Sequence, residues 1–198
     1  MPRLLESTRR LRRRGFVDAA WACIASKPYG DVTVDDICAE AEFSKGAFYA
    51  HFESKQELLL ALIDDDANAV ARLAAELDRA ADSPIRKLSK FARGAITRAS
   101  EAGRVQLRAD AWAAISSEPS VSARLDSAVQ DVRLVLRAWI EQAVEAGEMV
   151  EIPANAFASI LLALTDGLML HHALEASAFE WRNIQTALDV LLASITPR

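Results

Sequence analysis

The stretch TVDDICAEAEFSKGAFYAHFESK, residues Thr33 to Lys55, contains two short helical patterns and the start of a third, with almost no chain between them. Thr33 followed by Asp36 is an acidic variant of a capping box, which marks a helix start. Ser44 and Ser54 are placed as N-caps of the next two helices. Caps at this spacing leave room for helices of only two to three turns, so we expect two short helices joined by a tight corner.

The rest of the chain also predicts helices. Apolar residues recur at spacings of three and four, beginning with Phe16, Ala20 and Cys23, and no run of alternating β-branched residues occurs. Prolines near expected starts and glycines near expected stops divide the chain after the corner into long helices at about 54–80, 84–102, 104–117, 120–146, 154–175 and 179–195. We expect an all-α fold with an N-terminal three-helix domain, residues 1–53, and a helical C-terminal domain, residues 54–198.

Composition indicates a folded, soluble chain. Of 198 residues, 52% are hydrophobic and 26% are charged, which argues against disorder. Cys23 and Cys38 are too few for a disulfide framework and are expected to be reduced core residues. The most apolar segment, 154–170, is interrupted by polar residues, and the basic N-terminus lacks the pattern of a signal peptide. We therefore expect a cytoplasmic protein without a membrane partner.

The net charge of −5 is unevenly distributed along the chain. Residues 1–55 carry nine Lys or Arg against eight Asp or Glu, whereas the remainder carries 14 against 20. Because salt screens charges beyond about 8 Å, distant acidic groups have little effect on a phosphate at the basic end. A nucleic-acid partner is therefore compatible with the overall negative charge.

A helical wheel of residues 45–52 separates the helix after the corner into distinct faces. Phe48 and Phe52 share one face and are expected to anchor the helix in the core. The small residues Gly46, Ala47 and Ala50 allow close approach to base edges. The polar residues Lys45, Tyr49 and His51 are able to reach guanine edges or phosphates. Close packing of another helix is the alternative explanation for the small residues. As a whole, the arrangement is typical of a helix-turn-helix that presents a helix to the DNA major groove.

The segment TVDDICAEAEFSKGAFYAHFESKQELL resembles the helix-turn-helix of the TetR family of bacterial transcriptional regulators, through its S-K-G-A-F-Y-x-H-F core and the F-x-x-K continuation. The resemblance covers about residues 10–63. It departs from the family at Glu42, where glycine is usual, and at Phe43, where a smaller aliphatic residue is common. By this resemblance the phosphate contacts of an operator in double-stranded DNA would be Thr33, Tyr49, His51 and Lys55, and the base-facing residues would be Ser44, Lys45, Gly46 and Ala47.

The first fourteen residues contain six arginines, which are Arg3, Arg9, Arg10, Arg12, Arg13 and Arg14. The only acidic residue among these fourteen is Glu6. Two interpretations stay open. The arginines form an arm that follows the DNA backbone or enters an adjacent minor groove, or they are a solvated charged leader.

The long helices predict a homodimer, because one short recognition helix buries too little surface for a strong specific site. The segment 154–170 is apolar nearly all round and requires partners on several sides. We expect the last two helices to pair with their symmetry mates through Phe157, Ile160, Leu161, Leu164, Leu168, Ile184, Leu188 and Leu191. The alternative is a helix wholly buried inside a monomer.

The family resemblance implies a pocket for a small-molecule effector within the middle helices. Candidate lining residues are Phe91, Ala95, Trp112, Leu136 and Trp139, with Asp110 and Asp166 as polar anchors. Each aromatic residue has the alternative role of an ordinary core residue.

No enzyme or metal motif is present in the sequence, which lacks a glycine-rich phosphate loop and H-E-x-x-H. The adjacent His171 and His172 lack the spacing of a metal pair, so we expect no metal and no cofactor. We interpret the chain as a transcriptional repressor that a small-molecule effector releases from its operator, and not as an enzyme. The alternatives are a helical small-molecule-binding protein or enzyme with an inert N-terminal domain, and a DNA-binding dimer without a small ligand.

Overall fold

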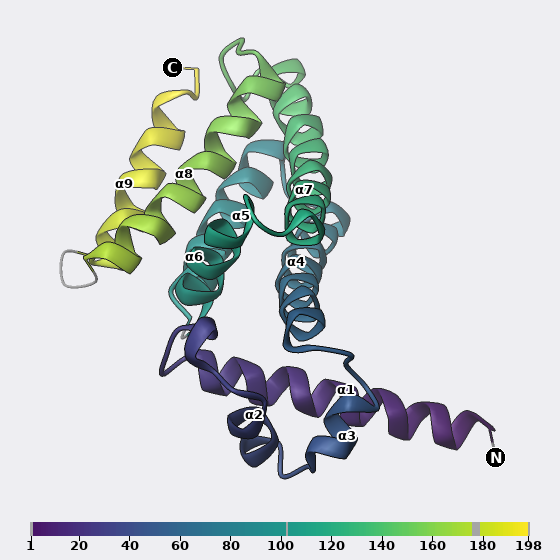
Figure 1. The fold of residues 1–198 in the computed structure, drawn as a ribbon. Helices are drawn as coiled ribbons and strands as arrows, with labels where there is room; N and C mark the ends of the chain where they lie inside the picture. Colours follow the sequence, from purple (N-terminus) through teal and green to yellow (C-terminus); the bar gives the residue numbers. More distant parts are fainter. Residues whose placement is uncertain (1, 102, 176–178, 198) are drawn as a thin grey trace. The chain divides into compact units, whose positions relative to one another are not determined.

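The computed structural model describes residues 2–101, 103–175 and 179–197, with only the backbone of residues 2–5. Within these ranges it consists of nine α-helices and one 3-10 helix, without a β-strand (Figure 1). The all-α class predicted from the sequence is confirmed. The elements are α1 (Pro2–Ile24), η1 (Tyr29–Asp31), α2 (Val34–Glu40), α3 (Lys45–Tyr49), α4 (Lys55–Arg79), α5 (Pro84–Ala99), α6 (Arg104–Ala114), α7 (Pro119–Glu145), α8 (Ala154–Leu174) and α9 (Trp181–Ser194).

The chain forms two compact units. Unit 1 contains Met1–Asp65 and Ala102–Arg124, and unit 2 contains Asp66–Glu101 and Leu125–Arg198. Helices α4 and α7 therefore each contribute residues to both units. The domain boundary at residue 53 stays a sequence-based prediction, and unit 1 additionally includes α6, which the sequence did not associate with the N-terminal helices.

Side-chain caps define the short helices of unit 1. The Thr33 hydroxyl accepts a hydrogen bond from the Asp36 amide at 3.1 Å, and the Asp36 carboxylate accepts one from the Thr33 amide at 2.7 Å, which completes a capping box. Ser44 caps α3 by accepting from the Ala47 amide at 3.1 Å. The Ser54 hydroxyl likewise accepts from the Glu57 amide at 3.2 Å. The three helix starts predicted from the sequence are confirmed.

The turn between α2 and α3 depends on an unusual backbone conformation at Glu42. Its φ angle of 55° is the one positive value at a non-glycine residue among the described residues. This conformation directs the Phe43 amide back to the Cys38 carbonyl oxygen at 3.0 Å, which closes the end of α2. A side chain at a left-handed position costs on the order of 1 kcal/mol, because Cβ is crowded by the backbone.

An aromatic cluster around Phe16 forms the core of unit 1. The Phe16 ring is fully buried and lies 5.2 Å from the ring of Phe43, 5.4 Å from that of Phe48 and 6.3 Å from that of Phe52, measured between centroids. Phe16 belongs to α1, whereas the other three residues lie in or next to α3. The cluster therefore fixes α3 against α1.

Unit 2 has its own core around Trp139. The Trp139 ring packs edge-to-face on Phe91 of α5, with centroids 6.0 Å apart, and its indole N–H donates to the Asp78 carboxylate at 2.9 Å. Leu188 and Leu192 of α9 form a second buried group with Ile96 of α5. These contacts hold α4, α5, α7 and α9 together within the unit.

Replacing Glu42 by glycine tests how much free energy the positive φ angle at this residue costs. We expect Glu42→Gly to raise the free energy of unfolding by about 1 kcal/mol, because glycine adopts a positive φ angle without steric conflict. The measurement is urea denaturation followed by circular dichroism at one fixed protein concentration. Glu42→Ala is the matched control, since it removes the charge but keeps Cβ; an equal gain in both variants would contradict the backbone explanation.

Candidate nucleic-acid interface

The short helix α3 is oriented as the helical wheel predicted. Phe48 and Phe52 are 0% and 1% exposed and face the core, whereas Tyr49 is 57% exposed. Gly46 and Ala50 are exposed as well, and Ala47 is half-buried. The side of α3 opposite Phe48 therefore presents small residues to solvent, which is the shape required for close approach to base edges.

Gly46 is not required by packing inside the unit. A Cβ atom built at this position would have Ser44 Oγ, at 3.8 Å, as its nearest contact. Its backbone φ angle is not positive either, so no turn conformation requires glycine there. The absence of a side chain instead leaves open space on the exposed side of the helix, where a surface could approach the backbone.

Lys45 forms an ion pair on the candidate interface. Its Nζ atom lies 2.7 Å from Asp35 Oδ1 of α2, with both side chains more than half exposed. The hydrogen bond from Lys45 to this carboxylate raises the lysine pKa, so the amine is a cation at neutral pH. A phosphate or a guanine edge would compete with Asp35 for it.

Lys55, which is expected to contact a phosphate, already has partners within the protein. Its Nζ atom donates to the Gly30 carbonyl oxygen at 2.9 Å and lies 4.8 Å from the centre of the Tyr29 ring. The Tyr29 hydroxyl in turn donates to the backbone carbonyl oxygen of Lys55. Lys55 therefore ties α4 to η1, and the amine is able to contact a phosphate after it exchanges the carbonyl partner.

His51 lies beside the buried aromatic cluster. Its ring centroid is 6.0 Å from that of Phe16, and its Nδ1 atom is buried without a hydrogen-bond partner. Burial, followed by the positive charges of nearby arginines, lowers the pKa of the imidazole below its usual value of 6.5. At neutral pH His51 is therefore mainly uncharged in the free protein.

The arginine-rich segment is part of helix α1, and its contact with DNA stays a prediction. Arg13 lies over the Phe52 ring at 4.4 Å and within 3.6 Å of a Glu57 carboxylate oxygen. Arg14 pairs with Asp18 at 2.7 Å and also with Asp65. Sequence reasoning missed these internal roles, because it could not show which carboxylates the fold brings to α1. The side chain of Arg3 lies outside the described residues.

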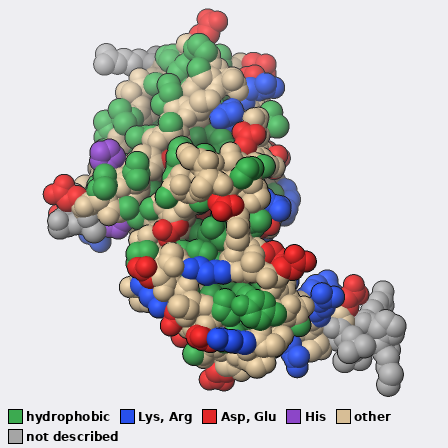
Figure 2. All heavy atoms as spheres, in the orientation of Figure 1, with side chains coloured by type: hydrophobic (Ala, Val, Ile, Leu, Met, Phe, Trp, Pro, Cys, Tyr) green, Lys and Arg blue, Asp and Glu red, His purple; other side chains and the backbone are tan. Residues whose placement is uncertain are grey.

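Figure 2 shows Lys and Arg side chains along the N-terminal half of α1, on the face in view. In Figure 1 this half of α1 extends past α3.

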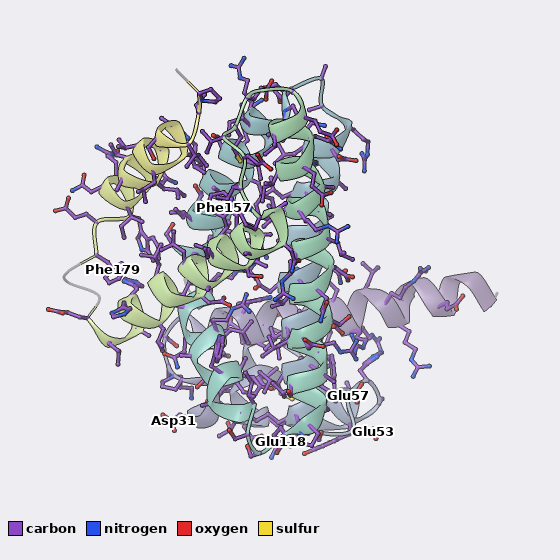
Figure 3. The ribbon with its side chains drawn as sticks, turned by 90° about the horizontal axis from the view of Figure 1, so that it is seen from above. Asp31, Glu53, Glu57, Glu118, Phe157 and Phe179 are labelled. Carbon is purple, nitrogen blue, oxygen red and sulfur yellow. The ribbon has the colours of Figure 1, made fainter. Side chains whose placement is uncertain are left out.

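Glu53 and Glu57 lie beside each other near the start of α4 (Figure 3), and the Glu57 carboxylate accepts a hydrogen bond from the Glu53 amide at 2.7 Å. Glu57, which also pairs with Arg13 of α1, is therefore already hydrogen-bonded to the backbone.

The candidate effector residues are divided between the two units. Asp110 and Trp112 belong to unit 1, where the Asp110 carboxylate accepts a hydrogen bond from the Tyr29 amide at 2.8 Å and Trp112 is 51% exposed. The other five belong to unit 2: Phe91, Leu136 and Trp139 are buried in its core, Ala95 packs against that core, and Asp166 is half-buried on α8. The observed contact of Asp110 stabilises η1, a role that the sequence did not suggest.

The candidate dimer residues differ in exposure. Leu188 is 7% exposed and packs on Ile96 within unit 2. Phe157, labelled in Figure 3, packs against both buried clusters of that unit. Ile160, Leu164 and Leu191 are exposed to 60%, 38% and 59%, and Leu161, Leu168 and Ile184 are half-buried. The exposed members are therefore the ones available to a partner.

Helix α8 is also, of the described helices, the one long and apolar enough to cross a membrane by length and composition alone. Core helices of soluble proteins share such a length and composition. No group of three potential metal ligands occurs among the described residues.

A short exposed helix that follows a tight turn and is anchored by buried aromatic residues has the geometry of a DNA-binding helix-turn-helix. Residues 16–62 match the bacterial regulatory proteins of the tetR family, and residues 84–197 match the C-terminal part of BetI-type transcriptional repressors. Since the second match spans more than half of the chain, the chain belongs to the TetR family of transcriptional regulators, with a BetI-type C-terminal domain. Members of this family are not enzymes.

Individual relatives agree with this assignment. An uncharacterized HTH-type transcriptional regulator of Bacillus subtilis, YwcC, is 45% identical over 49 residues, which are 25% of this chain and 22% of the relative. The HTH-type transcriptional repressor Rv1474c of Mycobacterium tuberculosis is 34% identical over 74 residues, 37% of this chain and 40% of the relative. The chain thus matches between 17% and 40% of the length of its curated relatives.

Solved structures show the same fold over nearly the whole chain. A transcriptional regulator from Saccharomonospora viridis, solved in complex with choline, has a TM-score of 0.79 at 22% identity and covers 94% of this chain and 98% of its own. At this identity the likeness supports the fold alone.

The Lys45–Asp35 pair leads to a prediction about affinity. We expect Asp35→Asn to tighten binding to DNA of any sequence by about two- to fivefold, because it frees Lys45 and removes a negative charge near the phosphates. Fluorescence anisotropy with several unrelated duplexes at fixed salt measures this change. Asp131→Asn, an exposed acid of α7 in unit 2, is the control, and equal tightening in both variants would reduce the effect to net charge.

Proposed function

We propose that this TetR-family protein is a repressor that binds an operator in double-stranded DNA as a homodimer and is released by a small-molecule effector. The observation that supports DNA binding most directly is the exposed side of α3, where Gly46 leaves open space beside Lys45 and Tyr49. Within this proposal, Ser44, Lys45, Gly46 and Ala47 face bases, while Thr33, Tyr49, His51 and Lys55 contact phosphates. The proposed location is the cytoplasm, where the operator would be accessible.

The exposed apolar residues of α8 and α9 support the dimer. Ile160, Leu164, Leu170, Val190 and Leu191 are each at least 38% exposed, although they are large and apolar. Exposed apolar residues concentrated on two helices mark an interaction surface. A twofold pairing of these helices would give a second recognition helix, and matching two half-sites one DNA turn apart requires a separation of about 34–36 Å.

The effector is proposed to bind in unit 2. Support comes from the match of residues 84–197 to BetI-type repressors, and the similarly folded S. viridis regulator contains choline. A ligand changes DNA affinity only if it binds one arrangement of the protein better than the other. A hundredfold preference corresponds to about 2.7 kcal/mol of coupling free energy. Choline is therefore a suitable first probe, with Asp166 as the candidate anionic partner on α8.

The proposal predicts results that two simpler arrangements would not give. A DNA-binding dimer without a small ligand would show no change of DNA affinity with any probe. A helical small-molecule-binding protein with an inert N-terminal domain would bind ligand but not DNA. Selection from random DNA, described next, distinguishes the proposal from a protein whose N-terminal domain does not bind DNA.

Selection from a random pool of duplex DNA tests the proposed function. We expect the wild-type protein to enrich a sequence with two half-sites, and Lys45→Ala and Tyr49→Ala to lose about fivefold or more in affinity for it, since each removes a contact worth about 1 kcal/mol or more. Circular dichroism verifies folding. Leu134→Ala, an exposed residue of α7, is the control for surface truncation. Equal binding by wild type and both interface variants would overturn the proposal.

Charge placed on the exposed face of α8 tests the dimer. We expect Ile160→Glu to produce a monomer at micromolar concentration, because a buried unpaired carboxylate opposes association, and to weaken operator binding. Sedimentation velocity measures the oligomeric state. Leu134→Glu provides a matched control, since Leu134 is 57% exposed and Ile160 60%. A wild-type monomer, or an unchanged dimer of Ile160→Glu, would argue against this interface.

A further inference from the structure

Gly15 of α1 lies against the ring of Phe43. A Cβ atom built at Gly15 would lie 3.1 Å from Phe43 Cε2 and 3.9 Å from Phe43 Cζ. The first distance is shorter than the separation of about 3.5–4.0 Å that two carbon atoms prefer. The φ angle of Gly15 is not positive, so the backbone conformation does not require glycine, although glycine weakens a helix. The missing side chain therefore makes room for the ring.

The backbone of Phe43 is fixed independently of its ring. The Phe43 amide donates to the Cys38 carbonyl oxygen at 3.0 Å, and the Glu42 amide donates to that of Ala39 at 3.3 Å. Together with the positive φ angle of Glu42, these two bonds form a hydrogen-bond pattern that ends many helices. Phe43 thus leaves the end of α2 in one defined direction.

The Phe43 side chain extends the aromatic cluster of unit 1 to the start of α3. Its ring is half-buried and lies 5.2 Å from that of Phe16, the residue after Gly15. Phe43 directly precedes Ser44, the N-cap of α3, whereas Phe48 anchors this short helix near its other end. In Figure 1 both α2 and α3 lie along α1. The Phe43 ring therefore acts as a spacer between α1 and the start of α3.

We propose that Gly15 and Phe43 are a matched pair of positioning residues, which sets the place of the start of α3 and thereby the base sequence that the protein selects. The ring occupies the space that Gly15 leaves on α1, and the residues that follow the ring in the chain are held at the corresponding height above α1. The inference rests on the proposed DNA-binding function and adds to it two residues that act without contacting a base.

The place of the start of α3 affects base contacts and phosphate contacts differently. The next residues in the chain, Ser44, Lys45 and Gly46, are among those proposed to face bases. Hydrogen bonds to base edges form over a narrow range of distances, about 2.7–3.2 Å, so a small displacement weakens discrimination between bases. Thr33 and Lys55, proposed to contact phosphates, lie outside α3 and have their own hydrogen bonds. The pair is therefore expected to affect the preference for a selected sequence more than the affinity for unrelated DNA.

A double-mutant cycle of Gly15→Ala and Phe43→Leu tests the pair. Fluorescence anisotropy at one salt concentration gives the ratio of affinities for a selected duplex and an unrelated duplex. We expect each single substitution to lower this ratio about fivefold or more, because the start of α3 moves away from α1 in the first variant and toward α1 in the second. In the Phe43→Leu background, Gly15→Ala should lower the ratio no further, since no ring remains for the added methyl group to displace. Equal losses from Gly15→Ala in both backgrounds would overturn the proposal.

Gly30→Ala is the matched control in the same unit. Apart from its chain neighbours, no described atom lies within 4 Å of a Cβ built at Gly30, and its φ angle is not positive. The substitution also keeps the carbonyl oxygen that accepts from Lys55. This variant should have the wild-type ratio. A loss as large as that of Gly15→Ala would assign the effect to glycine replacement in general and would overturn the pair.

Urea denaturation at one fixed protein concentration separates packing from positioning. Gly15→Ala should raise the denaturation midpoint in the Phe43→Leu background, because alanine favours a helix more than glycine does. In the wild-type background the contact with the ring should reduce or reverse this gain. If the midpoints behave in this way while neither single substitution changes the affinity ratio, the two residues pack together without positioning α3, and the proposal is wrong.

Phe43→Leu adds no atom to the core, so it decides the question alone if circular dichroism shows that Gly15→Ala does not fold. An unchanged affinity ratio in Phe43→Leu would then overturn the proposal, and a lowered ratio would support it.

The positioning role and the proposed function fail differently. If the wild-type protein binds every duplex equally, or binds none, the proposed operator recognition is wrong, and the positioning role is wrong with it. If the wild-type protein prefers a selected sequence and both single variants retain that preference in full, only the positioning role is wrong.

Discussion

The packing of Phe16 against Phe43, Phe48 and Phe52 is the interaction on which the candidate interface depends. A helix of five residues has too few internal hydrogen bonds to be stable alone, so its conformation must come from tertiary contacts. The four rings supply those contacts and at the same time determine which side of α3 faces solvent. Truncation of one ring would therefore affect both the stability of unit 1 and the orientation of Tyr49.

Local patterns predicted the helices well, because caps and periodicity act over a few residues. Thr33, Ser44 and Ser54 mark helix starts, and Phe48 with the following Phe52 identifies the buried side of α3. Contacts between distant segments were not predictable in this way. No local pattern relates Asp110 to the Tyr29 amide, and none indicates that α6 shares a unit with α1. Apolar periodicity indicates the apolar effector candidates, but it identifies core positions such as Trp139 equally well.

The basic residues of unit 1 are largely engaged in the free protein. Lys45 holds Asp35, Lys55 holds the Gly30 carbonyl, and Arg13 holds Glu57. An anion must therefore exchange with existing partners, which reduces the net gain from each new contact. The cost of this exchange weakens binding to an arbitrary polyanion, which offers few contacts at a time. It weakens binding to a complementary DNA site less, because several contacts form there together.

Cys23 is half-buried and Cys38 is buried, which affects the chemistry of both thiols. Desolvation raises the pKa of both the Cys23 and Cys38 thiols, and the carboxylates near each add to the effect. Thiolate is the form that peroxides and electrophiles attack, so both sulfur atoms are poor nucleophiles at neutral pH. Both thiols are therefore expected to react slowly with peroxides at neutral pH.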